Sequence, residues 1–171
     1  LESKKENVCL LVYGSPLFAT THMTLINDCK NARVKVKIIY AASVFDAIAE
    51  SGLQLYKFGK ISSMPKWEVN FKPMSFLDYV IENSKSGAHS LILVDIGLKF
   101  KDALEELVES LNVKSLKMDK ILVCSQLGVN GKFHYGSVDK LKNKKIKAPF
   151  CFVILGKMHF AEEEVVKSFL V

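Results

Sequence analysis

"VCLLVYGSPLFATTHMTLINDCKNARVKVKIIY", residues 8–40, is the stretch that decides the expected fold. The continuous apolar run 8–13 predicts a buried strand, which Gly14 closes. Apolar residues at helical spacing over 20–31 predict a helix, and the alternation in 34–40 predicts a second strand. A strand, a helix and a strand in this order are typical of a parallel sheet.

The rest of the chain changes in pattern after residue 52. Residues 43–52 predict a helix capped by Ser43 and ended by Gly52. Further on, 67–71 alternates as a half-solvated antiparallel strand does. The remaining predictions are helices over 73–87, 100–111 and 161–170 and strands over 89–95, 120–127, 132–138 and 149–155. We therefore predict an α/β chain with a parallel βαβ part over 1–50 and a second, mixed α+β domain over 51–171.

Composition limits the classes of protein that the chain can belong to. With 171 residues and 49% hydrophobic content it can bury a core of its own. Cys9, Cys124 and Cys151 lie in strand-like runs without a C-x-x-C pair, which predicts buried free thiols and neither a zinc site nor a disulfide framework. No apolar run reaches the roughly 18 residues of a membrane span, and the first residues lack a signal-peptide pattern, so a cytoplasmic location is expected.

Charge gives a second, weaker indication. The formal net charge is +6, and "KLKNKKIK", 140–147, supplies five of the lysines. Such a run favours encounter with an acidic protein, RNA or a ribosome-associated partner. A solvated loop is the alternative interpretation of the same run.

A candidate site follows from the two predicted parallel strands. Ligands of open α/β sheets bind outside the carboxyl ends of the strands, where the loops 14–18 and 40–43 lie. Ser15 and Ser43 offer hydroxyl groups there, and Phe18 offers an apolar wall. The low glycine content favours a small organic ligand over a phosphate. An ordinary polar turn is the alternative for this stretch, and Asp95, at the end of another buried strand, is a second candidate that could equally cap its own turn.

Four stretches together resemble one family. They are "YGSPLFATTH" (13–22), "IIYAASVFDAIAESGLQLYKFG" (38–59), the pattern PxSFxDxVxxNxxxGxHSLxLVDI (73–96) and "LGKMH" (155–159). In this order and spacing they resemble the diphthine synthases, also called diphthine methyl ester synthases, which are tetrapyrrole-methylase-like methyltransferases. The match is close over 8–110 and looser over 120–171.

The resemblance implies a cytoplasmic enzyme that uses S-adenosylmethionine to methylate a modified histidine of translation elongation factor 2 in diphthamide biosynthesis. It implies a two-domain α/β fold with the cofactor between the domains, and a homodimer without a membrane or a direct nucleic-acid partner. No metal is implied. Cofactor-facing positions by correspondence are Ser15, Phe18, Ser43, Val44, Val94, Leu127 and Phe150. Ser15 replaces an Asp of the family, and Phe150 replaces a His of many relatives.

Two family features are missing from the sequence. A strand with a glycine-rich loop would precede Leu1, and a proline-containing stretch would stand where "ESLNVKSLKMDK", 109–120, is found. We therefore expect weak S-adenosylmethionine binding and little turnover from these 171 residues alone. The sequence assigns no general base, and methyl transfer by alignment of two reactants needs no protein nucleophile. The alternatives are a tetrapyrrole-type methyltransferase and a degenerate, non-catalytic domain that binds elongation factor 2 or RNA.

Overall fold

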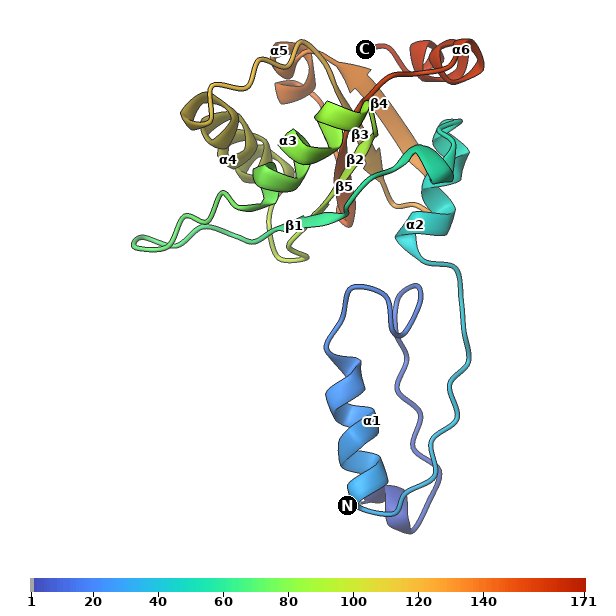
Figure 1. Ribbon diagram of the computed structural model, residues 1–171. Coiled ribbons are helices and arrows are strands. Elements are labelled where there is room, and N and C mark those ends of the chain that lie inside the picture. Colours follow the sequence, from blue (N-terminus) through green and yellow to red (C-terminus); the bar gives the residue numbers. More distant parts are fainter. Residues whose placement is uncertain (1) are drawn as a thin grey trace. The chain divides into compact units, whose positions relative to one another are not determined.

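The computed structural model describes residues 2–171, which form two compact units (Figure 1). The first unit ends at Ala47 and the second spans Ile48–Val171. The first unit contains a 3-10 helix, Glu2–Lys4, and the α-helices α1, His22–Asn31, and α2, Val44–Ala47. Helix α1 confirms the helix predicted over 20–31. Whether 1–50 and 51–171 are the domains of the fold stays a prediction.

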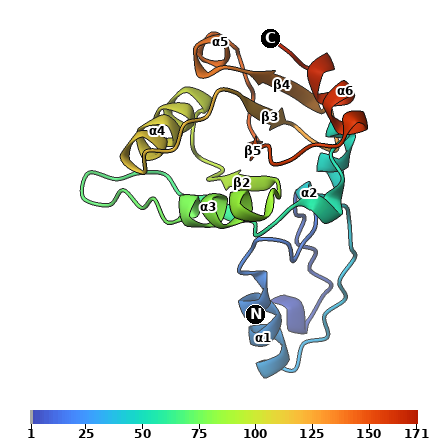
Figure 2. The ribbon, with the colours of Figure 1, turned by 45° about the horizontal axis from the view of Figure 1, so that its top comes forward.

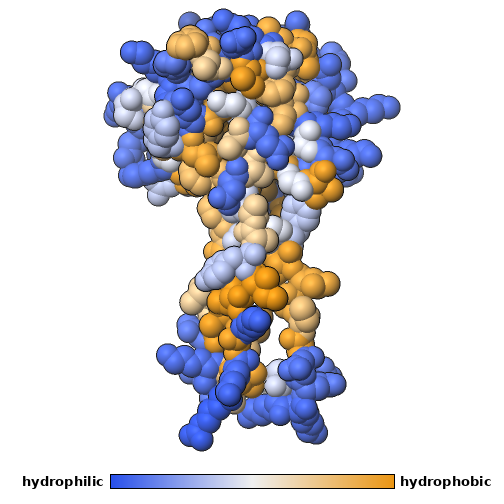
Figure 3. Space-filling view, turned by 90° about the vertical axis from the view of Figure 1, so that its right-hand side faces the viewer, coloured by the Kyte–Doolittle hydropathy of each residue, from blue (hydrophilic) through white to orange (hydrophobic). Residues whose placement is uncertain are grey.

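The prediction of β-strands over 8–13 and 34–40 is wrong. Both segments are extended, and neither forms a strand in the part of the chain that the structure describes. A β-strand requires main-chain hydrogen bonds to an adjacent strand, and these two segments do not form such a ladder with each other. Their side chains are accordingly open to solvent, with Leu11 89% and Ile39 77% exposed, and Cys9 is an exposed thiol instead of a buried one. Figure 3 shows hydrophobic side chains at the surface of this unit.

The second unit is built on a five-stranded mixed sheet in the order β1-β2-β5-β3-β4. The strands are β1, Ser62–Met64; β2, Ser90–Val94; β3, Ile121–Ser125; β4, Lys132–Gly136; and β5, Phe150–Ile154. Only the β1–β2 pair is parallel among the described strands. The positions of β2 to β5 confirm four of the strands predicted for this part. The mixed α/β architecture predicted for the chain is confirmed.

The strand predicted over 67–71 is also wrong. These residues form a narrow hairpin turn, held by the bridge between Glu68 and Phe71. The alternation of apolar and polar residues suits a strand only when one face is covered, and Val69 at the tip is 95% exposed. The true edge strand, β1, lies just before it and consists of two serines and a methionine, which carry little strand preference.

Helices cover the sheet and complete the core (Figure 2). They are α3, Phe76–Ser86; α4, Phe100–Val113; α5, Val138–Lys142; and α6, Phe160–Ser168. Leu77 of α3 and Leu107 of α4 are fully buried in one cluster with Ile92, Val123 and Phe152 of the sheet. Helices α3, α4 and α6 confirm the predicted helices. Helix α5 falls partly on the lysine run that the solvated-loop interpretation covers, where Leu141 anchors it in the core.

The segment after α2 is a 3-10 helix, Ile48–Ser51, that stops at Gly52 as predicted. Gly52 has a φ of +80°, and a Cβ there would lie 2.6 Å from two side-chain carbons of Val165 on α6. Both the left-handed backbone and the close approach of α6 therefore require glycine.

Strand directions place several loops at one end of the sheet. Since β3 and β2 both run antiparallel to β5, and β1 runs parallel to β2, the carboxyl ends of β1, β2 and β3 lie together. The loops that leave this end are 65–73, 95–99 and 126–131. We refer to it as the carboxyl end of the sheet.

Candidate functional site

Three predicted cofactor-facing residues gather at the carboxyl end of the sheet. Cys151 of β5 pairs with Leu93 of β2, so the next residues outward are Phe150 and Val94. Phe150 also pairs with Ser125, the last residue of β3, and Leu127 follows two positions later. The structure thus places Val94 and Phe150 on neighbouring strands, with Leu127 in the turn after β3 at the same end of the sheet.

The side chains of Val94, Phe150 and Leu127 differ in how deeply they are buried. The Phe150 ring is 8% exposed and meets the rings of Phe100 and Phe152 edge-on, with centroids 5.5 and 5.9 Å apart. Val94 packs against the same core, while Leu127 is half-buried. The side chains of Phe150 and Val94 therefore belong mainly to the core, and whether these two residues face a cofactor stays a prediction. Leu127 offers an apolar side chain as well.

The two loops of the predicted pocket in the first unit lie side by side. A Cβ on Gly14 would be 3.5 Å from the carbonyl oxygen of Ala42. The ring of Phe18 stacks on the ring of Phe45, with centroids 6.4 Å apart and planes 9° apart. Gly14 has a φ of +82°, a backbone conformation that glycine adopts without strain. The loops 14–18 and 40–43 thus lie close together within this unit, but not at the edge of a parallel sheet as expected, because the strands predicted to carry them do not form.

Ser43 is held in place by Asp46, one turn further along the chain. Its main-chain N–H and its hydroxyl group both donate to Asp46 Oδ2 at 2.6 Å, and the N–H of Asp46 donates back to Ser43 Oγ at 3.2 Å. The hydrogen bond from the Ser43 side chain is the main cause that lowers the pKa of Asp46. Because its proton is already engaged, the Ser43 hydroxyl can accept a hydrogen bond from a ligand but not donate one. Val44 begins α2 next to it.

Ser15 stands in a turn that His22 stabilises. The ring nitrogen Nδ1 of His22 lies 2.7 Å from the carbonyl oxygen of Pro16, and the main-chain N–H of His22 donates to Thr20 Oγ1 at 3.1 Å. Since a carbonyl can only accept, Nδ1 carries the proton. The "ATTH" part of the first motif therefore closes the turn that presents half-buried Ser15 and Phe18.

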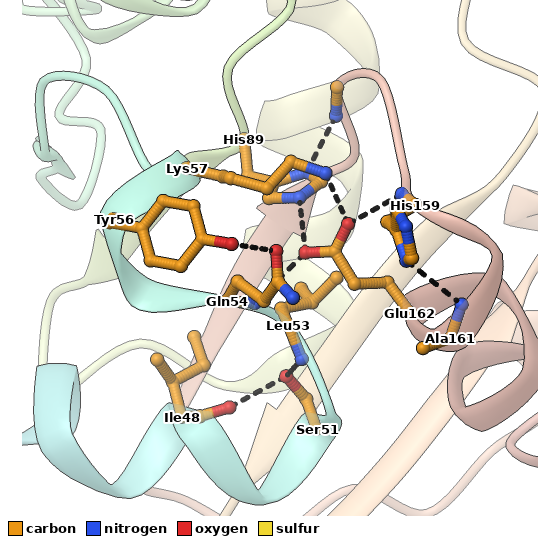
Figure 4. A network of polar contacts seen from close by, with 11 residues as sticks. Ile48, Ser51, Leu53, Gln54, Tyr56, Lys57, His89, His159, Ala161 and Glu162 are labelled. Carbon is orange, nitrogen blue, oxygen red and sulfur yellow. Dashed lines mark hydrogen bonds and ion pairs between the residues drawn. The ribbon is translucent and has the colours of Figure 1, made fainter.

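A second polar centre lies in the second unit and was not predicted from the sequence (Figure 4). The carboxylate of Glu162, whose side chain is 1% exposed, accepts from the main-chain N–H groups of Gln54 at 2.9 Å and His159 at 2.7 Å. It also pairs with the ammonium group of Lys57 and with Nε2 of His89 at 3.3 Å. Each carboxylate oxygen thus has two partners.

The protonation states in this centre follow from its donors. Gly156 donates its N–H to Nδ1 of His89 at 2.9 Å, so the neutral ring carries its proton on Nε2 and donates it to Glu162. Burial lowers the pKa of His89 and keeps the ring neutral. Burial alone would raise the pKa of Glu162, but the hydrogen bonds from His159, Lys57, Gln54 and His89 together hold it at about 2. Because each oxygen of Glu162 already has two partners and its pKa is low, this carboxylate holds segments together and is not available as a general base.

This centre joins three segments that are distant in sequence: 52–59, 87–90 and 156–163. Asp95, the other sequence candidate, is exposed at the carboxyl end of the sheet, where its Oδ1 accepts the N–H of Gly97 at 3.2 Å. That contact is the turn-capping role that the sequence left open.

Within residues 2–171 no three His, Cys, Asp or Glu side chains are placed to share a metal ion, and no helix has the length and apolar character to cross a membrane.

Comparison with known proteins identifies the family. Residues 1–141 match the family of tetrapyrrole (corrin/porphyrin) methylases. A diphthine synthase from Methanococcus maripaludis is 34% identical over 178 residues, which cover 97% of this chain and 70% of the relative. A diphthine methyl ester synthase from Candida glabrata is 44% identical over 98 residues, 57% of this chain and 33% of the relative.

Solved structures agree with the sequence relatives. A crystal structure from Entamoeba histolytica, provisionally named a diphthine synthase, superposes with a TM-score of 0.89 at 27% identity and covers 98% of this chain and 73% of that one. Another crystal structure of diphthine synthase gives a TM-score of 0.82 at 26% identity, covering 99% of this chain and 68% of that one. The chain therefore belongs to the tetrapyrrole methylase family and, within it, to the diphthine synthases.

Proposed function

We propose that the protein is an S-adenosylmethionine-dependent methyltransferase that methylates a modified histidine of translation elongation factor 2 in diphthamide biosynthesis. The acceptor is the amino-carboxypropyl group attached to that histidine. The observation that carries the proposal is the identity of 34% with a diphthine synthase over 97% of this chain. We further propose that it acts in the cytoplasm as a homodimer, as the family resemblance implies.

The residues proposed to face S-adenosylmethionine suit its chemistry. In the first unit, the half-buried ring of Phe18, stacked on Phe45, suits an apolar or aromatic part of the ligand. In the second unit, Leu127 offers an apolar side chain. The Ser43 hydroxyl accepts a hydrogen bond from a ligand donor such as an amino group, and Ser15 contributes another hydroxyl. When bound, S-adenosylmethionine supplies an activated methyl group on a sulfonium centre.

The protein's contribution to such a reaction is alignment. Displacement at a methyl group with a good leaving group requires the acceptor nitrogen or oxygen to approach in line, and well-oriented reactants gain roughly 7–11 kcal/mol of the barrier. Residues on turns fixed by hydrogen bonds, such as Ser43 with Asp46 and the 15–18 turn with His22, serve that purpose. No buried carboxylate with a free lone pair is required.

The test is transfer of a labelled methyl group from S-adenosylmethionine to elongation factor 2 that carries the histidine precursor. Label in the modified histidine is expected, and its absence with an intact precursor contradicts the proposal. Activity on precorrin-like substrates instead would favour the tetrapyrrole-type alternative. Binding of elongation factor 2 without any cofactor affinity would favour the degenerate, non-catalytic domain.

A further inference from the structure

Exposed hydrophobic side chains recur on every loop at the carboxyl end of the sheet. Val69 and Phe71, on the hairpin 65–73 after β1, are 95% and 58% exposed. Ile96, in the turn after β2, is 86% exposed, and Val129, in the turn after β3, is 68% exposed. We call these four residues the apolar rim. Figure 1 shows the hairpin extending away from the sheet between β1 and α3.

The hairpin is held in its projecting position by contacts with α4. The main-chain N–H of Trp67 donates to Glu106 Oε1 at 3.3 Å, and the ammonium group of Lys72 pairs with Glu109 at 3.1 Å. The same ammonium group lies 4.6 Å from the centroid of the Trp67 ring. Val69 and Phe71 are therefore presented at the end of an anchored element, and a projecting apolar tip contributes little to the fold itself.

The other two loops are also ordered by their own hydrogen bonds. In the turn after β2, the N–H of Asp95 donates to Met64 at 3.1 Å and that of Leu98 donates to Asp95 at 3.0 Å. Leu98 points into the core with 3% exposure, while Ile96 points to solvent. After β3, Val129 and Asn130 both donate to the carbonyl oxygen of Gln126, at 3.3 and 3.1 Å. The apolar rim thus consists of residues directed outward by fixed turns.

Charge around the rim favours an acidic partner. Lys66, Lys99 and Lys132 are exposed on or beside the three loops, against the exposed carboxylates Glu68 and Asp95. These groups leave a small excess of positive charge beside the apolar side chains. Apolar anchors with charged groups around them are typical of a protein-binding surface, because burial supplies affinity and the charges steer encounter.

We infer that the apolar rim docks an acidic, partly apolar surface of the folded protein that carries the acceptor side chain. The inference rests on the proposed function, which requires a protein substrate. It is favoured by position, since the rim surrounds the same end of the sheet at which Val94, Phe150 and Leu127 gather. Side chains spread over loops from three strands exceed what a single amino-carboxypropyl group could cover.

The test compares the double variant Val69→Ser/Phe71→Ser with the control Val113→Ser, which changes a 62% exposed valine at the far end of α4. All three substituted side chains are exposed, so the melting temperature should stay the same. Binding of elongation factor 2 is measured without cofactor, and KM and kcat for methyl transfer are measured at saturating S-adenosylmethionine.

We expect the double variant to bind elongation factor 2 about tenfold more weakly and to raise KM by a similar factor, since exposed anchors of this kind contribute on that scale. The kcat and the S-adenosylmethionine affinity should stay within about twofold, and the control should match the wild type. Unchanged binding in the double variant would overturn the inference. So would conversion of a dimer to a monomer by the same substitutions, because the rim would then contact a second copy.

Failure of the proposed function gives a different result. If the wild type binds elongation factor 2 through the rim but transfers no methyl group, the docking surface stands and the methyltransferase proposal fails. If methyl transfer occurs and the double variant behaves as the wild type in both binding and KM, only the docking surface fails.

Discussion

His89 donates its Nε2 proton to Glu162 Oε1 across 3.3 Å at a place where their side chains are 0% and 1% exposed. This contact joins the start of β2 to α6, two segments that are 73 residues apart in the chain. Because the same carboxylate binds Lys57 and two main-chain N–H groups, it connects three segments that are distant in sequence.

Removing the charge of Glu162 should destabilise the second unit strongly. Glu162→Gln replaces one acceptor oxygen by an NH2 group, which faces donors that then lose their partner. We expect a loss of about 2–4 kcal/mol in the free energy of unfolding, measured by urea denaturation. Glu164→Gln, on the same helix but exposed, is the matched control and should change it by less than about 0.5 kcal/mol. Equal stability of the two variants would refute the role given to Glu162.

The same pair predicts acid lability in two pH windows. His89 titrates below its ordinary pKa of 6.5, so the unfolded chain binds its proton first and stability falls as the pH drops below about 6.5. Glu162 has its pKa lowered from 4.5 to about 2, so its contribution is full above pH 4.5 and is lost as the pH falls through 2. Protonation of Glu162 across the second window should lower the free energy of unfolding by about 3 kcal/mol.

Denaturant titrations at a series of pH values from pH 8 down through pH 2 measure both windows. In His89→Gln the decline between pH 7 and pH 5 should become shallower than in the wild type, while the decline below pH 4.5 remains. An identical pH dependence in the two proteins would mean that His89 is not held neutral by burial.

Gly156 lies where no side chain fits. A Cβ at this position would meet the carbonyl oxygen of Gly87 at 2.3 Å and the carbonyl carbon of Ala88 at 2.5 Å. Gly156→Ala must therefore shift the main chain that carries the N–H donor to His89, and we expect a loss of about 3 kcal/mol or more in thermal or urea unfolding. Gly97→Ala serves as the control, because its nearest such contact is 4.0 Å away. Both alanine variants unfolding alike would contradict the packing described for this turn.

Ser15 is the position at which a charge should improve cofactor binding. The family resemblance places a carboxylate there, and a charged acceptor strengthens a hydrogen bond by about 1 kcal/mol. Ser15→Asp should therefore bind S-adenosylhomocysteine about fivefold more tightly by calorimetry. Ser15→Asn, which adds similar volume without charge, should not. Unchanged binding by the aspartate variant would place Ser15 outside the pocket, and weaker binding would contradict a ligand donor that faces this position.

Regular elements of the second unit could be predicted because periodicity and burial coincide there. Helices α3 and α4 have one apolar side facing the sheet, and β2, β3 and β5 are continuous apolar runs covered on both faces. Prediction of strands from apolar patterns failed where no adjacent strand or covering layer buries the segment. Residues 8–13 have the composition of a buried strand but no neighbouring strand within residues 2–171. Residues 67–71 alternate although Val69 and Phe71 are exposed.

The candidate site likewise has a part that could be predicted from the sequence and a part that could not. The loops at Ser15 and Ser43 lie close together although the two strands from which this was expected do not form. Val94, Leu127 and Phe150 gather at one end of the sheet, and their role toward a cofactor stays a prediction from the family resemblance. The Glu162 centre could not be found locally. Three consecutive glutamates at a helix start suggest only a favourable interaction with the helix dipole, and nothing in "AEEE" indicates which one turns inward to meet His89.

The most direct test of the account is incorporation of labelled methyl from S-adenosylmethionine into elongation factor 2 by the protein. The substrate must carry the amino-carboxypropyl group on its histidine, and a substrate with an unmodified histidine is the control. We predict label in the modified histidine alone. Label in neither substrate, with the precursor verified by mass spectrometry, would contradict the assignment.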